Sequence, residues 1–144
     1  MSAGKYKNPI IYEDLINAAE KRLQPLLHEL KEINGYRAAC IMTSTGELLS
    51  VDSVNKKINL SVVGPIFNDI FQDAHEASKK IGLGSCFETS IKTPRGIIII
   101  RCSGVESEIH FHTLTIMVSD GNYALMKMKL EGLIPRIMQT LLEE

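Results

Sequence analysis

A chain of 144 residues that is 44% hydrophobic and 23% charged is long enough for one domain with a sizeable core, and this composition excludes a disordered polypeptide. Its 16 basic and 17 acidic residues leave a net charge of −1, which gives no electrostatic basis for binding nucleic acid or an anionic membrane. Apolar runs such as Ile97–Ile100 are far too short to cross a bilayer, and the first residues lack the apolar run of a signal peptide. We therefore expect a cytoplasmic protein without membrane insertion.

The N-terminal part of the chain is expected to be a tail followed by helix. Residues 1–8 are predicted to be a disordered tail. From Ile10 to about Arg22 the apolar residues recur at helical spacing. Pro25 removes one backbone hydrogen bond, so we expect it to kink or split the helix, which then continues to the stop signal at 34–35.

A hairpin and a second helix are predicted next. Two strands, over 36–43 and 47–51, flank a tight turn that contains Gly46. The following helix is expected over 60–81, with Asn59 or Ser61 as its N-cap. It carries a broad apolar stripe, which predicts that it packs on the sheet.

The remainder of the chain is predicted to close the sheet. The strand over 109–118 is apolar on both of its alternating faces in its second half, so it should lie inside the sheet with a layer on each side. Asp120 is the expected cap of the last helix, and Gly121 allows the sharp turn before it. The predicted elements of this part are strands over 86–92, 96–102 and 109–118 and a helix over 122–142. The whole order, α-β-β-α-β-β-β-α, predicts an α+β fold with a mainly antiparallel sheet between helices.

Motifs for chemistry are mostly missing from the sequence. It contains no phosphate-binding GxxxxGK[ST] loop, no HExxH, no GxSxG and no CxxC pair. No nucleophile has a recognisable base nearby, so we expect a non-enzymatic protein without a cofactor. Cys40, Cys86 and Cys102 each fall within a predicted strand and are interpreted as small buried side chains.

One pair of side chains has metal-ligand spacing. His110 and His112 lie two residues apart on a strand, so both imidazoles point the same way and could reach one ion. A site needs further ligands, and Glu106 and Glu108 are close in sequence. Because two histidines at a partly exposed strand start are common without metal, we predict no metal site. A metal-sensing or small-molecule-sensing domain that uses this face is kept as a third hypothesis.

The strand over 86–92 is the best candidate for an open edge of the sheet, because it follows a helix directly and alternates well. An unpaired edge tends to pair with another chain. The preceding helix carries two phenylalanines and a glycine that permits close approach, and together these features predict a two-fold interface. The residues assigned to this dimer interface are Gly64, Phe67, Phe71, Cys86, Glu88 and Ser90. The alternative is that the two phenylalanines fill the core of a monomer.

Three stretches, over 26–50, 81–84 and 120–126, together resemble the Roadblock (dynein light chain) family. They correspond to a helix leading into a glycine-turned hairpin, a Gly-Leu-Gly stop after the middle helix, and the entry to the last helix. The resemblance covers about residues 23–142. It implies a five-stranded antiparallel sheet of order 2-1-5-4-3, and a homodimer joined through the middle helices and third strands. It also implies that the protein has no active site of its own.

Prokaryotic members of this family are typically partners or regulators of Ras-like small GTPases, so the resemblance implies that such a GTPase is the partner. Our first hypothesis is a dimeric module that binds a GTPase and modulates its nucleotide cycle. The alternative is a structural adaptor of a larger complex that does not affect nucleotide cycling. We expect a single domain over 9–144, and it departs from the family in an N-terminal helical extension over about 9–22 and in Pro135.

Overall fold

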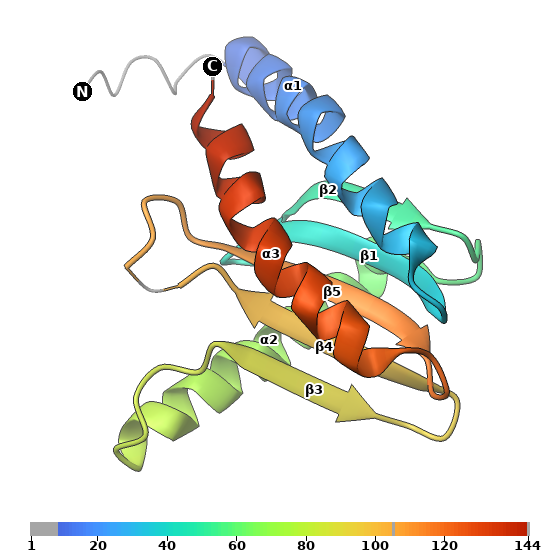
Figure 1. The fold of residues 1–144 in the computed structure, drawn as a ribbon. Helices are drawn as coiled ribbons and strands as arrows, with labels where there is room; N and C mark the ends of the chain where they lie inside the picture. Colours follow the sequence, from blue (N-terminus) through green and yellow to red (C-terminus); the bar gives the residue numbers. More distant parts are fainter. Residues whose placement is uncertain (1–8, 105, 144) are drawn as a thin grey trace.

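The computed structural model describes residues 9–104 and 106–143, with side chains from residue 19 onward, so the expected tail over 1–8 lies outside the described residues. The elements are α1 (Pro9–His28), the 3-10 helix η2 (Glu29–Glu32), β1 (Tyr36–Thr43), β2 (Leu48–Ser53), α2 (Leu60–Lys80), β3 (Glu88–Lys92), β4 (Gly96–Cys102), β5 (Phe111–Val118) and α3 (Tyr123–Leu142). The strands pair antiparallel in the order β2-β1-β5-β4-β3 (Figure 1). This confirms the predicted α+β fold, the predicted strand order and the central place of β5.

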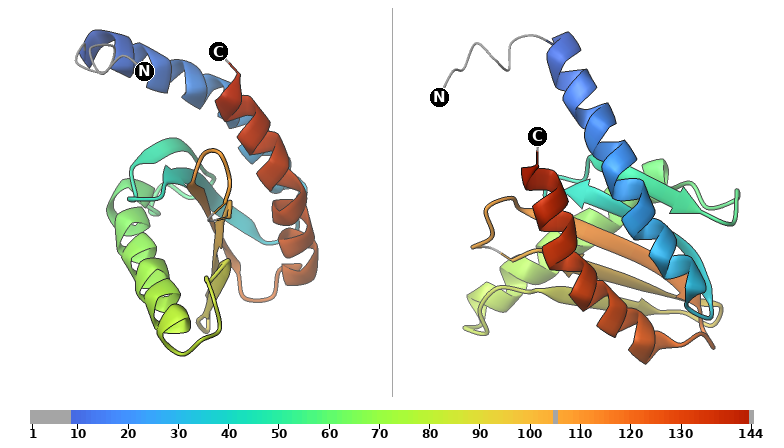
Figure 2. Two further views of the ribbon diagram at one scale, coloured as in Figure 1. Left: turned by 90° about the vertical axis from the view of Figure 1, so that its left-hand side faces the viewer. Right: turned by 45° about the horizontal axis from the view of Figure 1, so that its top comes forward.

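The sheet lies between two helical layers. Helices α1 and α3 cover one face and α2 covers the other, as the left view of Figure 2 shows. Each face has its own apolar cluster. The run of isoleucines in β4 serves both: Ile97 and Ile99 face α1 and α3, whereas Ile98 and Ile100 face α2. A strand that is apolar on both faces is thus explained by a helical layer on each side.

The N-cap of α2 is predicted correctly, but that of α3 is not. The side-chain oxygen of Asn59 accepts a hydrogen bond from the backbone N–H of Ser61 at 3.2 Å, as expected for the start of α2. At α3 the cap is Asn122, which accepts from Leu125 N at 3.1 Å, and not Asp120. Asp120 lies too early, because the chain completes its turn after β5 before the helix begins.

Two glycines form the joint between β1 and the turn into α3. Gly35 has a φ of +97°, and a Cβ on Gly121 would lie 2.9 Å from the Gly35 Cα and 2.7 Å from the Asn34 carbonyl oxygen. That carbonyl accepts from Asn122 N at 2.9 Å. The backbones can approach this closely only because no side chain stands between them.

Helix α1 continues through Pro25 without a break, so the predicted split does not occur. Its buried residues face β2 and α3, and the Arg22 guanidinium donates to the carbonyl oxygens of Thr140 (3.3 Å) and Glu143 (3.0 Å) at the end of α3. Tertiary packing therefore offsets the loss of one backbone hydrogen bond. The predicted extension over 9–22 is the first part of this same helix. Among the described residues, no helix is both long and apolar enough to cross a membrane.

Candidate interaction surface

Helix α2 has an apolar inner face and a second apolar row on its outer face. Its buried residues point to the sheet. Val62, Ile66 and Ile70 recur every fourth residue on the other side and are 57%, 55% and 42% exposed. Four-residue spacing keeps side chains on one side of a helix, so these three form a continuous exposed row.

The structure places three of the expected interface residues on the inner side of α2. Phe71 is 1% exposed, and its ring lies 4.8 Å from that of His112. Gly64 is buried so close to the sheet that a Cβ would be 3.5 Å from the Met42 sulfur. Phe67 is half-buried against the same cluster. Phe71 thus fills the core and Phe67 lies at its margin, and the outer row supplies the exposed apolar surface of this helix.

Strand β3 lies at the edge of the sheet and pairs only with β4 within the described chain. It begins at Glu88, two residues later than predicted. Cys86 precedes the strand and packs against the cluster under α2. The backbone N–H of Cys86 donates to His75 Nδ1 at 3.2 Å, which turns this segment toward the helix.

Glu88 and Ser90 attach the edge strand to β4 and α3 of the same chain. The Glu88 carboxylate is 2.7 Å from Arg101 Nη1 on β4 and 2.8 Å from Lys127 Nζ on α3. Its hydrogen bond to Lys127 raises the pKa of that lysine. The hydroxyls of Ser90 and Tyr123 are 2.6 Å apart. Both side chains therefore lie on the α3 side, and the backbone of β3 remains the free edge.

The connection between α2 and β3 continues the apolar surface. Ile81, Leu83 and Phe87 are 72%, 75% and 65% exposed, so three large apolar side chains face solvent within seven positions of the chain. We call these three residues, the row Val62, Ile66 and Ile70, and the free edge of β3 the α2–β3 surface. The four-residue spacing of the row can be read in the sequence, but the larger apolar stripe on the inner side of the same helix obscures it.

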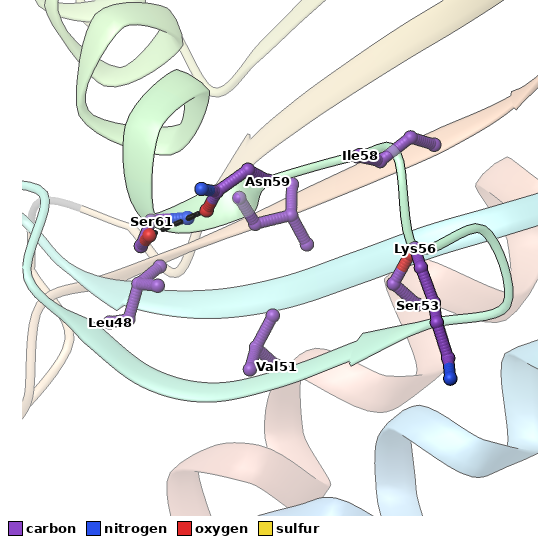
Figure 3. A pocket seen from close by; sticks show the side chains of 8 residues that line it. Leu48, Val51, Ser53, Lys56, Ile58, Asn59 and Ser61 are labelled. Carbon is purple, nitrogen blue, oxygen red and sulfur yellow. Dashed lines mark hydrogen bonds between the residues drawn. The ribbon is translucent and has the colours of Figure 1, made fainter.

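An open pocket lies at the opposite edge of the sheet. It has a volume of about 360 Å³ and is formed by β2, the loop after it and the start of α2 (Figure 3). Leu48, Val51, Ile58 and Leu60 supply its apolar lining, and Asn59, the N-cap of α2, also lines it. No carboxylate, histidine or cysteine is among the described residues that line it. The lining therefore offers an apolar recess without a pair of groups for acid–base chemistry.

The His-x-His pair is joined in space by a cysteine rather than by the nearby glutamates. Cys102, His110 and His112 bring one ligand atom each within 4.8 Å of one another. Glu106 and Glu108 are exposed and do not belong to this group. Cys40 is buried elsewhere in the core, and burial raises the pKa of its thiol to about 12, as expected for an unreactive core cysteine. The pairing of Cys102 with His112 across two strands is a signal that sequence spacing alone does not carry.

Comparison with known proteins finds similarity in structure only. No family model and no curated protein matches the sequence. Among solved structures, an MglB with tetrameric arrangement is 14% identical, with a TM-score of 0.75 over 86% of this chain and 90% of that one. A Roadblock/LC7 domain from Streptomyces avermitilis is 11% identical, with a TM-score of 0.74 over 84% and 98%. The gliding protein MglB from Thermus thermophilus is 14% identical, with a TM-score of 0.73 over 86% and 91%.

Proposed function

We propose that this chain, which has the fold of Roadblock/LC7 domains and MglB, is a non-enzymatic homodimeric module that binds a Ras-like small GTPase and modulates its nucleotide cycle. The observation that carries the proposal is the α2–β3 surface, in which an exposed apolar helix row lies beside an unpaired strand edge. The class of partner follows from the Roadblock resemblance. A cytoplasmic location is part of the same proposal.

A second copy of the chain is the occupant that this surface fits best. Two β3 edges related by a two-fold axis pair antiparallel and extend both sheets into one, since such an interface joins the same patch on each subunit. The same axis brings the two α2 helices together. An MglB with tetrameric arrangement is among the proteins that share this fold, which supports self-association as a property of the fold.

Burial of the two helix rows alone stabilises a dimer by no more than about the cost of association. Val62, Ile66 and Ile70 are each about half exposed, so burying the rest of six such side chains contributes roughly 5–9 kcal/mol. Association costs about 4–15 kcal/mol in lost motional freedom. Because the helix rows leave no clear surplus, we propose the whole surface as the interface, including Ile81, Leu83, Phe87 and the strand pairing.

A single charge in the helix row tests the dimer. Ile66→Asp places two unpaired carboxylates at the axis, which costs about 3–5 kcal/mol and weakens the dimer more than a hundredfold. Sedimentation equilibrium at micromolar concentration should show monomers. The matched control is Met128→Asp, because Met128 is 70% exposed on α3, on the opposite face of the sheet, and its variant should remain dimeric. A dimer that persists in Ile66→Asp contradicts the interface.

GTPase binding is tested in a separate experiment, so that a protein that dimerises but binds no GTPase can be distinguished from one that does both. The purified protein is used to capture partners from native cytosol with GTP analogue or GDP present, and a retained GTPase is then purified. We expect retention in one nucleotide state and a changed rate of GTP hydrolysis or nucleotide exchange, reduced by Ile66→Asp if the dimer forms the binding site. Large assembly proteins retained equally in both states, without a GTPase, would instead support the structural adaptor.

A further inference from the structure

Two strands and a returning loop bring a cysteine and two histidines together beneath α2. Cys102 ends β4 and pairs in register with His112 of β5, so their side chains point to the same face of the sheet. Between β4 and β5 the chain returns toward Cys102, so that His110 Nε2 lies 2.8 Å from Cys102 Sγ. The rings of His110 and His112 are 5.2 Å apart at their centroids. These residues lie outside the α2–β3 surface.

Asn68 determines which ring nitrogen of His112 carries the proton. Asn68, 1% exposed, donates from its Nδ2 to the carbonyl oxygen of Ser44 at 3.1 Å, which orients its amide. Its Oδ1 then faces His112 Nδ1 at 2.6 Å and can only accept, so Nδ1 carries the proton. The Nε2 lone pair of His112 is therefore free as an acceptor.

That lone pair is unsatisfied in the interior. His112 is 0% exposed, and its Nε2 has no hydrogen-bond partner among the described residues. A buried polar atom without a partner is destabilising, so native proteins rarely keep one without a reason. Here the ring lies beside a thiol and a second imidazole, and the three residues bring one possible ligand atom each within 4.8 Å of one another. This combination points to a ligand that takes nitrogen and sulfur donors together.

We propose that Cys102 Sγ, His110 Nε2 and His112 Nε2 bind one Zn²⁺ ion, with water in the fourth tetrahedral position. Zinc accepts this mixture of thiolate and imidazole ligands, at about 2.3 Å to sulfur and 2.0–2.1 Å to nitrogen. Tetrahedral geometry then separates the ligand atoms by roughly 3.3–3.6 Å. The present separations, from 2.8 Å up to 4.8 Å, bracket that range, so ring and thiol rotations of modest size complete the site.

The residues around the three proposed ligands favour zinc binding. A zinc-bound histidine typically donates its second N–H to a carbonyl or carboxylate, which sets the ring orientation, and Asn68 provides that partner for His112. Burial lowers the pKa of His112 to about 4 and also lowers that of His110, which leaves both rings in the neutral form that binds metal. Burial raises the pKa of the Cys102 thiol, so zinc displaces a proton from it on binding.

Cobalt titration tests the site by a readout independent of any activity. The full chain, without a histidine tag, is reduced, stripped of metal and titrated with Co²⁺. We expect one Co²⁺ per chain, with the visible bands of tetrahedral cobalt and a near-ultraviolet thiolate-to-cobalt band that Zn²⁺ abolishes. Cys102→Ser should remove the thiolate band, and His110→Gln should weaken binding at least about tenfold.

The matched control is Cys86→Ser, because Cys86 is a half-buried cysteine under the same helix but outside the three-residue group. It should keep the thiolate band. Zn²⁺ should also raise the melting temperature of the parent protein and of Cys86→Ser, but not that of Cys102→Ser, provided that circular dichroism shows each variant folded. The proposal is overturned by binding below one ion per chain, by a thiolate band that survives Cys102→Ser, or by one that disappears with Cys86→Ser.

Discussion

Adding a single methyl group at Gly121 should destabilise the protein through the joint between β1 and α3. A Cβ there would meet the Asn34 carbonyl oxygen and the Met117 Cε, each at 2.7 Å, and the Gly35 Cα at 2.9 Å. Only the methionine can rotate away, because the other two atoms belong to the backbone. The backbones must therefore separate by about half an ångström or more, and overpacking of this kind typically costs about 1–3 kcal/mol.

We place the cost of Gly121→Ala at about 2–3 kcal/mol, since two contacts with backbone atoms cannot be relieved locally. For a domain of this size, that lowers the melting temperature by roughly 6–12 °C. Calorimetry or thermal circular dichroism measures the shift. All variants are compared at one protomer concentration, because self-association makes the melting temperature concentration-dependent.

The matched control is the same substitution at Gly132 in α3. A Cβ on this exposed glycine has no neighbour within 4 Å, so Gly132→Ala gains helix propensity and should stabilise by about 0.5–1 kcal/mol. The two glycine-to-alanine changes should thus have opposite signs. A Gly121→Ala variant that melts within about 1 °C of the parent would refute the close approach of the two backbones.

Two further predictions concern polar contacts between elements. The Glu29 carboxylate binds Arg136 and Lys129, and these contacts hold its pKa at about 2 in place of 4.5. Because the folded pKa is depressed, the stabilisation is present above pH 4.5 and is lost as the pH falls toward 2. Glu29→Gln should cost about 1 kcal/mol at pH 7 and almost nothing near pH 2; equal melting differences at both pH values would contradict this. Tyr36→Phe removes the hydrogen bond from a 4%-exposed tyrosine to Asp52 (2.5 Å) and should cost about 1–2 kcal/mol in urea unfolding. Tyr123→Phe, which loses a more exposed bond, should cost less; a reversed order would contradict the assignment.

The local pattern of the sequence determined the elements and their order. Alternation in 109–118 and the isoleucines of 97–100 predicted strands covered on both faces, because side-chain direction along a strand has a period of two. Asn59 predicted the start of α2 for an equally local reason, because an N-cap side chain accepts a hydrogen bond from a backbone N–H within the next three residues. The order of the strands in the sheet came from the resemblance to Roadblock proteins and is confirmed by the structure.

Only the tertiary structure decided which of two apolar sides of α2 faces the sheet. Phe71 and Gly64 lie inside and the row with Ile66 lies outside, because the packing of the helix against the sheet selects the buried face. Of the residues predicted for the interface on this helix, Gly64 and Phe71 are buried against the sheet, and the exposed apolar row lies on the other side. The continuity of α1 through Pro25 was also decided by tertiary structure, because contacts with β2 and α3 offset the backbone hydrogen bond lost at the proline.

The cysteine–histidine group also depends on contacts between elements that lie apart in the sequence. The sequence by itself presented His110 and His112 on one side of a strand, because that relation is local. It could not place Cys102 beside them, because strand register depends on pairing between residues ten positions apart along the chain. Nor could it place Asn68 of helix α2 against His112 of β5. Local spacing determines which side chains share a face, and only the packed sheet decides which faces meet.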